Sequence, residues 1–177
     1  MDEKKVLDRL QRLCSRAEYC SADVTRKALR SLEGDSAAAG RVVAALVRER
    51  YVDDARYASA FARDKASLQG WGPVKIRYAL RAKGITGDVA EEAIREACGV
   101  SSADDRMEKL LAAKARTLLS TEGKDPASRA RNSQSSPSTR ARNTQDSSAI
   151  RVKLLRYALG RGYTYDQAAP VIEKILG

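Results

Sequence analysis

The sequence reads VKIRYALRAKGIT at Val74–Thr86 and VKLLRYALGRGYT at Val152–Thr164, and the two stretches align without gaps. A more diverged copy precedes them, in which Val24 and Gly34 lie fifty residues before the corresponding valine and glycine. The match between the two later copies continues, pairing Asp88 with Asp166, Ala90 with Ala168 and Ile94 with Ile172. A spacing of about fifty residues between similar segments indicates tandem structural repeats. Because one unit of this size buries little surface, we expect three in a row to share interfaces.

Apolar residues recur at the three- and four-residue spacing of amphipathic helices, as in Val6, Leu10, Leu13 and Ala17, and few segments alternate as strands do. We therefore predict an all-α fold: three tandem three-helix, helix-turn-helix-like repeats in an elongated curved array. The expected repeats span 1–52, 53–100 and 101–177. The expected helices span about 4–18, 21–32, 36–50, 53–68, 73–83, 87–98, 103–121, 148–160 and 165–176.

Residues 123–147 interrupt the third repeat and contain no Val, Ile, Leu, Met or aromatic residue. Because such a segment cannot offset the entropy of ordering by burial, we expect a flexible Ser/Arg-rich insertion. Its charge of five basic minus two acidic residues, +3, leaves two interpretations open. It is either a neutral insertion in a permissive loop or a cationic finger that contacts phosphates. The second interpretation would use Arg129, Arg131, Arg140 and Arg142.

The composition excludes several classes of enzyme. The 177 residues include no histidine, so nucleophile systems and zinc sites that need imidazole are excluded. We find no phosphate-binding loop, no nucleophile elbow and no metal-spaced carboxylate cluster. The three cysteines form no CxxC pair and are interpreted as small buried apolar residues rather than metal ligands or disulfides. We therefore expect a protein without catalytic activity, metal or cofactor.

The charge balance favours a polyanionic partner. Lys and Arg number 33 against 23 Asp and Glu, which gives a net charge of +10. The longest apolar run is far shorter than the ~20 residues of a membrane-spanning helix, and no signal peptide is evident. We expect a cytoplasmic protein that does not associate with membranes.

Positive charge concentrates on the middle helix of each repeat, whereas the third helix of the second repeat is acidic. No acidic residue occurs from Val74 to Gly84, where Arg77 and Arg81 lie four residues apart and share one helix face. This pattern is either a solvated helix face or a basic stripe that binds phosphates or an acidic protein groove. Trp71, Tyr78 and Tyr157 lie near it and are expected to pack in the core or at helix ends.

Two adjacent carboxylates, Asp53 and Asp54, follow Tyr51 and Val52. We interpret them as helix caps, because carboxylates at a helix start accept hydrogen bonds from its unpaired amides. Arg56 is expected to pair with one of them.

The stretch Tyr51–Phe61, YVDDARYASAF, resembles the Y-(I/L/V)-D-(D/E)-x-R-(F/Y)-A-x-x-F signature of the RecX family. Gly72–Ile85 is similar to the family's G-x-x-(K/R)-I-x-x-x-L-x-x-K-G-I block, and Cys14–Leu29 looks like its first unit. The resemblance covers residues 6–100 well and the third repeat less well. Two features depart from the family: the turn at Ser31–Asp35, which lacks the usual glycine followed by an apolar residue, and the insertion.

The resemblance implies a small bacterial regulator, not an enzyme. It implies binding to the RecA recombinase in the groove of the RecA filament on single-stranded DNA, and restraint of RecA ATPase and strand exchange. It further implies a role in homologous recombination, DNA repair and the SOS response. The expected partners are RecA and the RecA–single-stranded DNA filament, with weak direct DNA binding at most, for a monomeric protein.

Two alternatives remain open. A helix-turn-helix-like regulator could read duplex DNA without RecA, although the middle helices lack a base-reading Arg/Asn/Gln cluster at their amino ends. A generic single-strand binder would need more exposed aromatic residues. For the filament or nucleic-acid interface, the expected residues are Arg56, Arg63, Lys65, Lys75, Arg77, Arg81, Lys83, Arg151, Lys153, Arg156 and Arg161.

Overall fold

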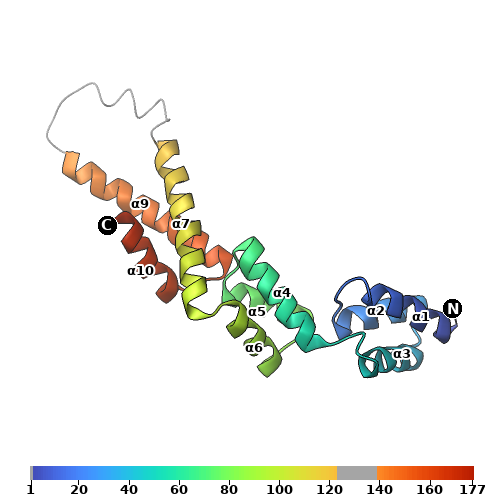
Figure 1. The fold of residues 1–177 in the computed structure, drawn as a ribbon. Coiled ribbons are helices and arrows are strands. Elements are labelled where there is room, and N and C mark those ends of the chain that lie inside the picture. The colour runs from blue at the N-terminus through green and yellow to red at the C-terminus, as the bar shows by residue number, and fades with distance from the viewer. Residues whose placement is uncertain (1, 123–138) are drawn as a thin grey trace. The chain divides into compact units, whose positions relative to one another are not determined.

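The computed structural model describes the backbone of residues 2–122 and 139–177, and the side chains of residues 2–99, 105–120 and 148–177 (Figure 1). Every regular element in these residues is an α-helix, so the predicted all-α fold is confirmed. None of the helices in this described part combines the length and apolarity that crossing a membrane requires. The helices are α1 (Glu3–Cys14), α2 (Ser21–Ser31), α3 (Ser36–Arg48), α4 (Asp54–Gln69), α5 (Pro73–Ala82), α6 (Gly87–Ala97), α7 (Val100–Glu122), α9 (Thr139–Arg161) and α10 (Tyr165–Leu176).

The helices follow one another as three tandem three-helix repeats, α1–α3, α4–α6 and α7–α10, and pack into two compact units. Unit 1 comprises Met1–Asp64 and Ile76–Ala97, and unit 2 comprises Lys65–Lys75 and Cys98–Gly177. Each unit buries an aliphatic core. One core gathers α1, α2 and α3 around Val6, Leu10, Val24, Val42 and Leu46. The other gathers α7, α9 and α10 around Met107, Leu111, Leu154 and Ile172.

The two later repeats match position by position, as their sequences predict. The pairs Ile76/Leu154, Leu80/Ala158, Ile85/Tyr163, Ala90/Ala168 and Ile94/Ile172 are all buried. Gly84 and Gly162 end the middle helices with φ of 77° and 90°, in the left-handed region that glycine adopts without steric cost. The aligned residues, whether identical or not, thus occupy equivalent core and turn positions.

The first repeat is shifted relative to the predicted alignment. Val24 is buried, whereas Val74, its predicted equivalent, is 45% exposed, so Val24 corresponds to Ile76 instead. The turn after α2 explains the difference, because Glu33 and Gly34 are both left-handed, with φ of 55° and 89°. This is the turn at which the sequence departs from the RecX pattern.

Two helix boundaries differ from the predictions. Helix α1 ends at Cys14 rather than at residue 18, and the chain then turns so that Tyr19 packs against the first core and Cys20 is buried. Helix α9 begins at Thr139, so residues 139–147, expected to be flexible, have a helical backbone. Adding a residue to an existing helix costs little, and the Arg, Ala and Gln in this stretch are good helix formers. The rest of the expected insertion, residues 123–138, lies outside the described residues.

Candidate functional site

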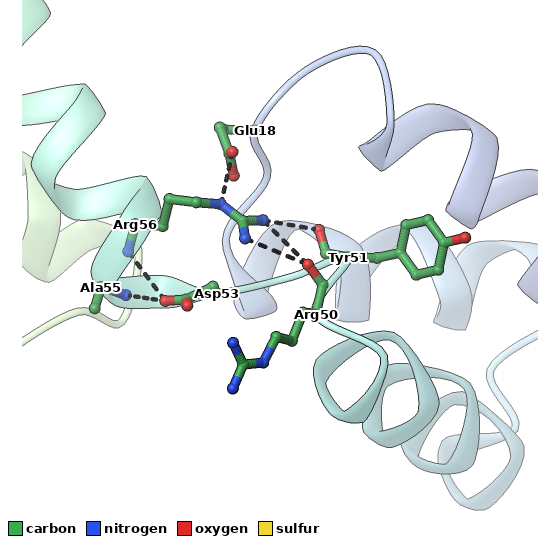
Figure 2. A network of polar contacts seen from close by, with 6 residues as sticks. All are labelled: Glu18, Arg50, Tyr51, Asp53, Ala55 and Arg56. Atoms are coloured by element: carbon green, nitrogen blue, oxygen red, sulfur yellow. Dashed lines mark hydrogen bonds and ion pairs between the residues drawn. The ribbon is translucent and has the colours of Figure 1, made fainter.

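The signature stretch Tyr51–Phe61 enters α4 through a polar network (Figure 2). The carboxylate of Asp53 accepts hydrogen bonds from the amides of Ala55 and Arg56, at 2.9 and 3.0 Å. These are amides of the first turn, which have no partner within the helix. The interpretation of Asp53 as a cap for this helix is confirmed.

The next residue, Asp54, caps a different helix. Its carboxylate accepts hydrogen bonds from the backbone amide of Ser21, at 2.7 Å, and from the Ser21 hydroxyl. Ser21 is the first residue of α2, and Cys20 before it makes no side-chain capping bond. The two adjacent carboxylates therefore hold the starts of two helices from different repeats, and both helix starts belong to unit 1.

Arg56 lies across the loop between the first two repeats, as Figure 2 shows. Its Nε donates to Glu18 at 2.7 Å, and its terminal nitrogens donate to the carbonyls of Arg50 and Tyr51 at 3.3–3.4 Å. The hydrogen bond that Arg56 donates to Glu18 raises the pKa of Arg56 above its ordinary value. Arg50 is left-handed, with φ of 59°, and Arg56 holds its carbonyl in that uncommon conformation. The predicted pairing of the Arg56 side chain with Asp53 or Asp54 is wrong, because its guanidinium pairs with Glu18 and with two backbone carbonyls instead.

Lys83 makes a second link between the first two repeats. Its ammonium donates to Asp23 of α2 at 2.8 Å, and the Asp23 side chain is only 16% exposed. Burial alone would raise the pKa of Asp23, but hydrogen bonds from Lys83 and Cys20 and the nearby positive charges outweigh it and hold that pKa below its usual value. The same hydrogen bond raises the pKa of Lys83. Lys83 thus stabilises the fold of unit 1.

The two arginines on α5 differ in their surroundings. Arg77 donates from Nε and a terminal nitrogen to both oxygens of Glu91 on α6, at 2.5 and 2.8 Å. This hydrogen bonding raises the pKa of Arg77 and lowers that of Glu91. No acidic residue lies within α5 itself, but the charge of Arg77 is neutralised by this carboxylate of the next helix. Arg81 is exposed and makes no ion pair within the described residues. Tyr78 beside it is 78% exposed, contrary to the expected packing role.

In unit 2, two of the expected interface lysines flank one aromatic ring. The ammonium groups of Lys65 and Lys75 lie 4.9 and 4.6 Å from the centre of the Trp71 ring. Such cation–π contacts are attractive, and Lys75 also donates to the carbonyl of Gly160 at 3.3 Å. Trp71 is half-buried, so this cluster fixes the start of α5 rather than offering a free stacking surface.

Arg161 joins the same region of unit 2. It donates to the carbonyl of Gln69 and lies over the ring of Tyr157, with its guanidinium 5.1 Å from the ring centre. Two backbone hydrogen bonds join the same segments. The amide of Gly72 donates to the carbonyl of Arg161 at 2.8 Å, and the amide of Val74 donates to the carbonyl of Gly162 at 3.1 Å. Arg161 is the repeat equivalent of Lys83, and both cations bind the preceding repeat. The presence of a basic residue at this position in both repeats therefore has a structural explanation.

The remaining expected residues are not gathered into one site by the described structure. Arg151 pairs with Glu173 at 3.2 Å. Arg63, Lys153 and Arg156 are exposed on α4 and α9. For the insertion, Arg129 and Arg131 lie outside the described residues, and Arg140 and Arg142 lie in the helical backbone of α9, where side chains are not described.

A basic groove between α1 and α2 was missed at the level of sequence. Its cations are Arg9, Arg12, Arg16, Lys27 and Arg30. A signal was present, because the three arginines of α1 and the loop after it follow the three- and four-residue spacing of one helix face.

Comparison with known proteins identifies the second repeat. Residues 53–94 match the family model described as RecX, second three-helix domain. This chain carries a RecX domain. The predicted resemblance to the RecX family is confirmed, and the matched range begins at the capping residue Asp53 and includes Arg77, Arg81 and Lys83.

Several proteins to which this chain is similar are named Regulatory protein RecX. The protein from Clostridium botulinum is 29% identical over 142 residues, 80% of this chain and 55% of that protein. The protein from Shigella dysenteriae is 31% identical over 101 residues, 52% of this chain and 60% of that protein. The chain thus aligns with little more than half the length of these curated relatives.

Solved RecX structures share the fold. A crystal structure of RecX from Lactobacillus salivarius has a TM-score of 0.69 and 20% sequence identity, covering 98% of this chain and 96% of that one. A crystal structure of another regulatory protein RecX has a TM-score of 0.67 and 21% identity, covering 98% of this chain and 70% of that one.

Proposed function

We propose that this RecX chain is a cytoplasmic, monomeric regulator that binds RecA and the RecA–single-stranded DNA filament. In this proposal it acts without catalytic chemistry and restrains RecA ATPase and strand exchange by steric bridging of adjacent RecA protomers. The observation that carries the proposal is the RecX domain match over residues 53–94. The name of the relatives, Regulatory protein RecX, supports a regulatory role.

Within unit 1, the surface best suited to this role is the outer face of α5. Arg81 and Tyr78 are exposed there, while Arg77 is held in place by Glu91. An exposed arginine next to an exposed tyrosine offers a charge and a ring for a partner, and both residue types are enriched at protein interfaces. We leave Arg56 and Lys83 out of the proposed interface. Their side chains bind the preceding repeat and stabilise the fold of unit 1.

Duplex reading by a helix-turn-helix is the alternative that we disfavour. Such a motif places its second helix in the major groove, and in this repeat that helix would be α6. Helix α6 carries Asp88, Glu91, Glu92 and Glu96, whose carboxylates repel DNA phosphates. Only Arg95 on α6 is basic.

The test is RecA ATPase on single-stranded DNA, titrated with purified chain at low salt. We expect hydrolysis to slow at or below equimolar chain, and the chain alone to hydrolyse no ATP. A duplex oligonucleotide that binds the chain more tightly than the filament does would favour the alternative. No change in RecA ATPase at a large excess of chain would refute the RecA proposal.

A further inference from the structure

The groove between α1 and α2 in unit 1 has a volume of about 470 Å³. Leu13 of α1 is the accessible part of its apolar lining, because the neighbouring Leu10 is only 1% exposed, and Ser31, the last residue of α2, also lines it. The volume lies within the range of pockets that hold small molecules or a few side chains. The groove therefore suits a short segment rather than an extended surface.

The charge around this groove is unbalanced. Of the eight residues that line it, all described, five are basic and none is acidic. Arg9 is positioned by a hydrogen bond from its guanidinium to the Ser31 hydroxyl at 2.6 Å. Arg12 and Arg30 are exposed and form no ion pair among the described residues. Elsewhere in unit 1 several arginines have acidic partners, so this group of uncompensated cations stands out.

The lining indicates what kind of anion fits. Arginine predominates among the cations, and its planar fork matches a carboxylate or phosphate with two parallel hydrogen bonds. Proteins that bind single strands combine a basic groove with aromatic side chains on which the bases stack, and no aromatic residue lines this groove. The nearby Tyr19 ring is already covered by Lys27, whose ammonium lies 5.2 Å from the ring centre. The leucine lining instead fits an aliphatic side chain.

We propose that the α1–α2 groove binds an acidic protein segment, with carboxylates on its arginines and an aliphatic side chain against Leu13. Recognition of acidic motifs by arginine clusters is a recurring mode of peptide binding. This inference goes beyond the filament proposal. The groove lies in the first repeat, outside the RecX domain match, and its test contains neither RecA nor filament.

The test uses a short fluorescein-labelled peptide of Asp and Glu residues with leucines between them, and fluorescence anisotropy with the full chain. We expect binding that weakens with salt, and no binding of the counterpart peptide in which Asn and Gln replace the acids. The double variant Arg12→Gln/Arg30→Gln should lose at least about tenfold in affinity, because each arginine supplies charge-assisted hydrogen bonds. The affinity of Arg12→Lys/Arg30→Lys should lie between that of the wild type and that of the Gln variant. Lysine keeps the positive charge but cannot form the two parallel hydrogen bonds of a guanidinium.

The matched control is Arg48→Gln/Arg95→Gln, which removes the same charge from exposed positions outside the groove. It should bind the peptide within about twofold of the wild type, because distant exposed charges are screened. Circular dichroism checks that all variants fold. Three outcomes would overturn the proposal: equal losses in the control, undiminished binding in the groove variant, or an oligothymidylate that displaces the peptide and itself needs Arg12 and Arg30. The last would make the groove a nucleic-acid site.

Discussion

The carboxylate of Asp54, at the start of α4, receives hydrogen bonds from both the amide and the hydroxyl of Ser21, at the start of α2. The neighbouring Asp53 caps α4 itself. A pair of acids that are adjacent in sequence thus fixes two helix starts from different repeats, and Arg56 ties the loop between them to Glu18. The acidic pair and the arginine of the RecX signature therefore act, in this chain, as structural links between repeats.

Replacing the two acids separately should give different local effects. Asp54→Ala should destabilise unit 1 by about 1.5–3 kcal/mol, because it removes two charge-assisted bonds at a part-buried position. Asp53→Ala should cost about 1 kcal/mol, as a lost helix cap does. Hydrogen exchange separates them: Asp54→Ala should speed exchange of the Ser21 amide, and Asp53→Ala that of the Ala55 and Arg56 amides. Identical exchange patterns for the two variants would contradict this division of roles.

The Asp23–Lys83 pair should make the stability of unit 1 depend on pH in acid. The folded pKa of Asp23 is held below its usual value, so the stability it contributes is present above the unfolded pKa of about 3.9 and is lost as pH falls through the lower folded value. The difference in Tm between the wild type and Lys83→Met should stay constant from neutral pH to about 5 and shrink below about 4. Arg41→Met, which breaks an exposed pair with Glu3, should change Tm little at neutral pH. A Lys83→Met difference that persists unchanged at pH 3 would show that the ion pair is not its cause.

The close approach of Gly162 to Lys75 should make Gly162 irreplaceable. A Cβ at Gly162 would lie 2.3 Å from the Lys75 Cβ and 2.5 Å from its backbone nitrogen, and the residue has φ of +90°. Gly162→Ala should therefore cost about 2–4 kcal/mol from backbone strain and overpacking together. Gly160→Ala is the control, because its Cβ would meet nothing within 4 Å and it lies in α9, where alanine should stabilise by about 0.5–1 kcal/mol. Trp71, the sole tryptophan, reports unfolding of this region by fluorescence.

Much of the fold could be predicted from the sequence, because it depends on local periodicity. The spacing of Val6 and Leu10 predicted a buried helix face, and the match of Gly84 to Gly162 predicted equivalent turns; both predictions are confirmed. Helix ends were less predictable, as at Cys14, where α1 stops so that later residues reach the core. That requirement is tertiary and leaves no local pattern.

The candidate site could be predicted less well, for a similar reason. Charge could be counted along α5, but the partner of Arg77 is Glu91 on another helix, and the partner of Lys83 is Asp23, sixty residues away. Sequence alone does not tell which cations are neutralised across helices. The structure makes that distinction, and it leaves Arg81 as the exposed charge on α5 without an ion pair in the described residues.

Reversing the charge of Arg81 should weaken filament binding without harming the fold. Arg81→Glu alters an exposed side chain away from caps and core, so the free energy of unfolding should change by no more than about 0.5 kcal/mol. Affinity for RecA–single-stranded DNA filaments should fall about tenfold or more, because a lost charge-assisted contact is worth roughly 1.5–3 kcal/mol. If the partner group is a phosphate on single-stranded DNA, the slope of log affinity against log salt should drop by about 0.7. Binding measured across a salt series, beside circular dichroism, checks both points.

The comparison variants follow from the ion pair on the same face. Glu91→Lys is not a neutral control, because it would remove the partner of Arg77. The exchange Arg77→Glu/Glu91→Arg keeps an ion pair between α5 and α6 while moving its positive end off α5. If the filament contacts Arg77 as well as Arg81, the exchanged variant should fold but bind the filament less tightly than the wild type. If Arg77 only links the helices, the exchange should bind like the wild type while Arg81→Glu does not. Wild-type affinity in both variants would remove the α5 face from the proposed interface.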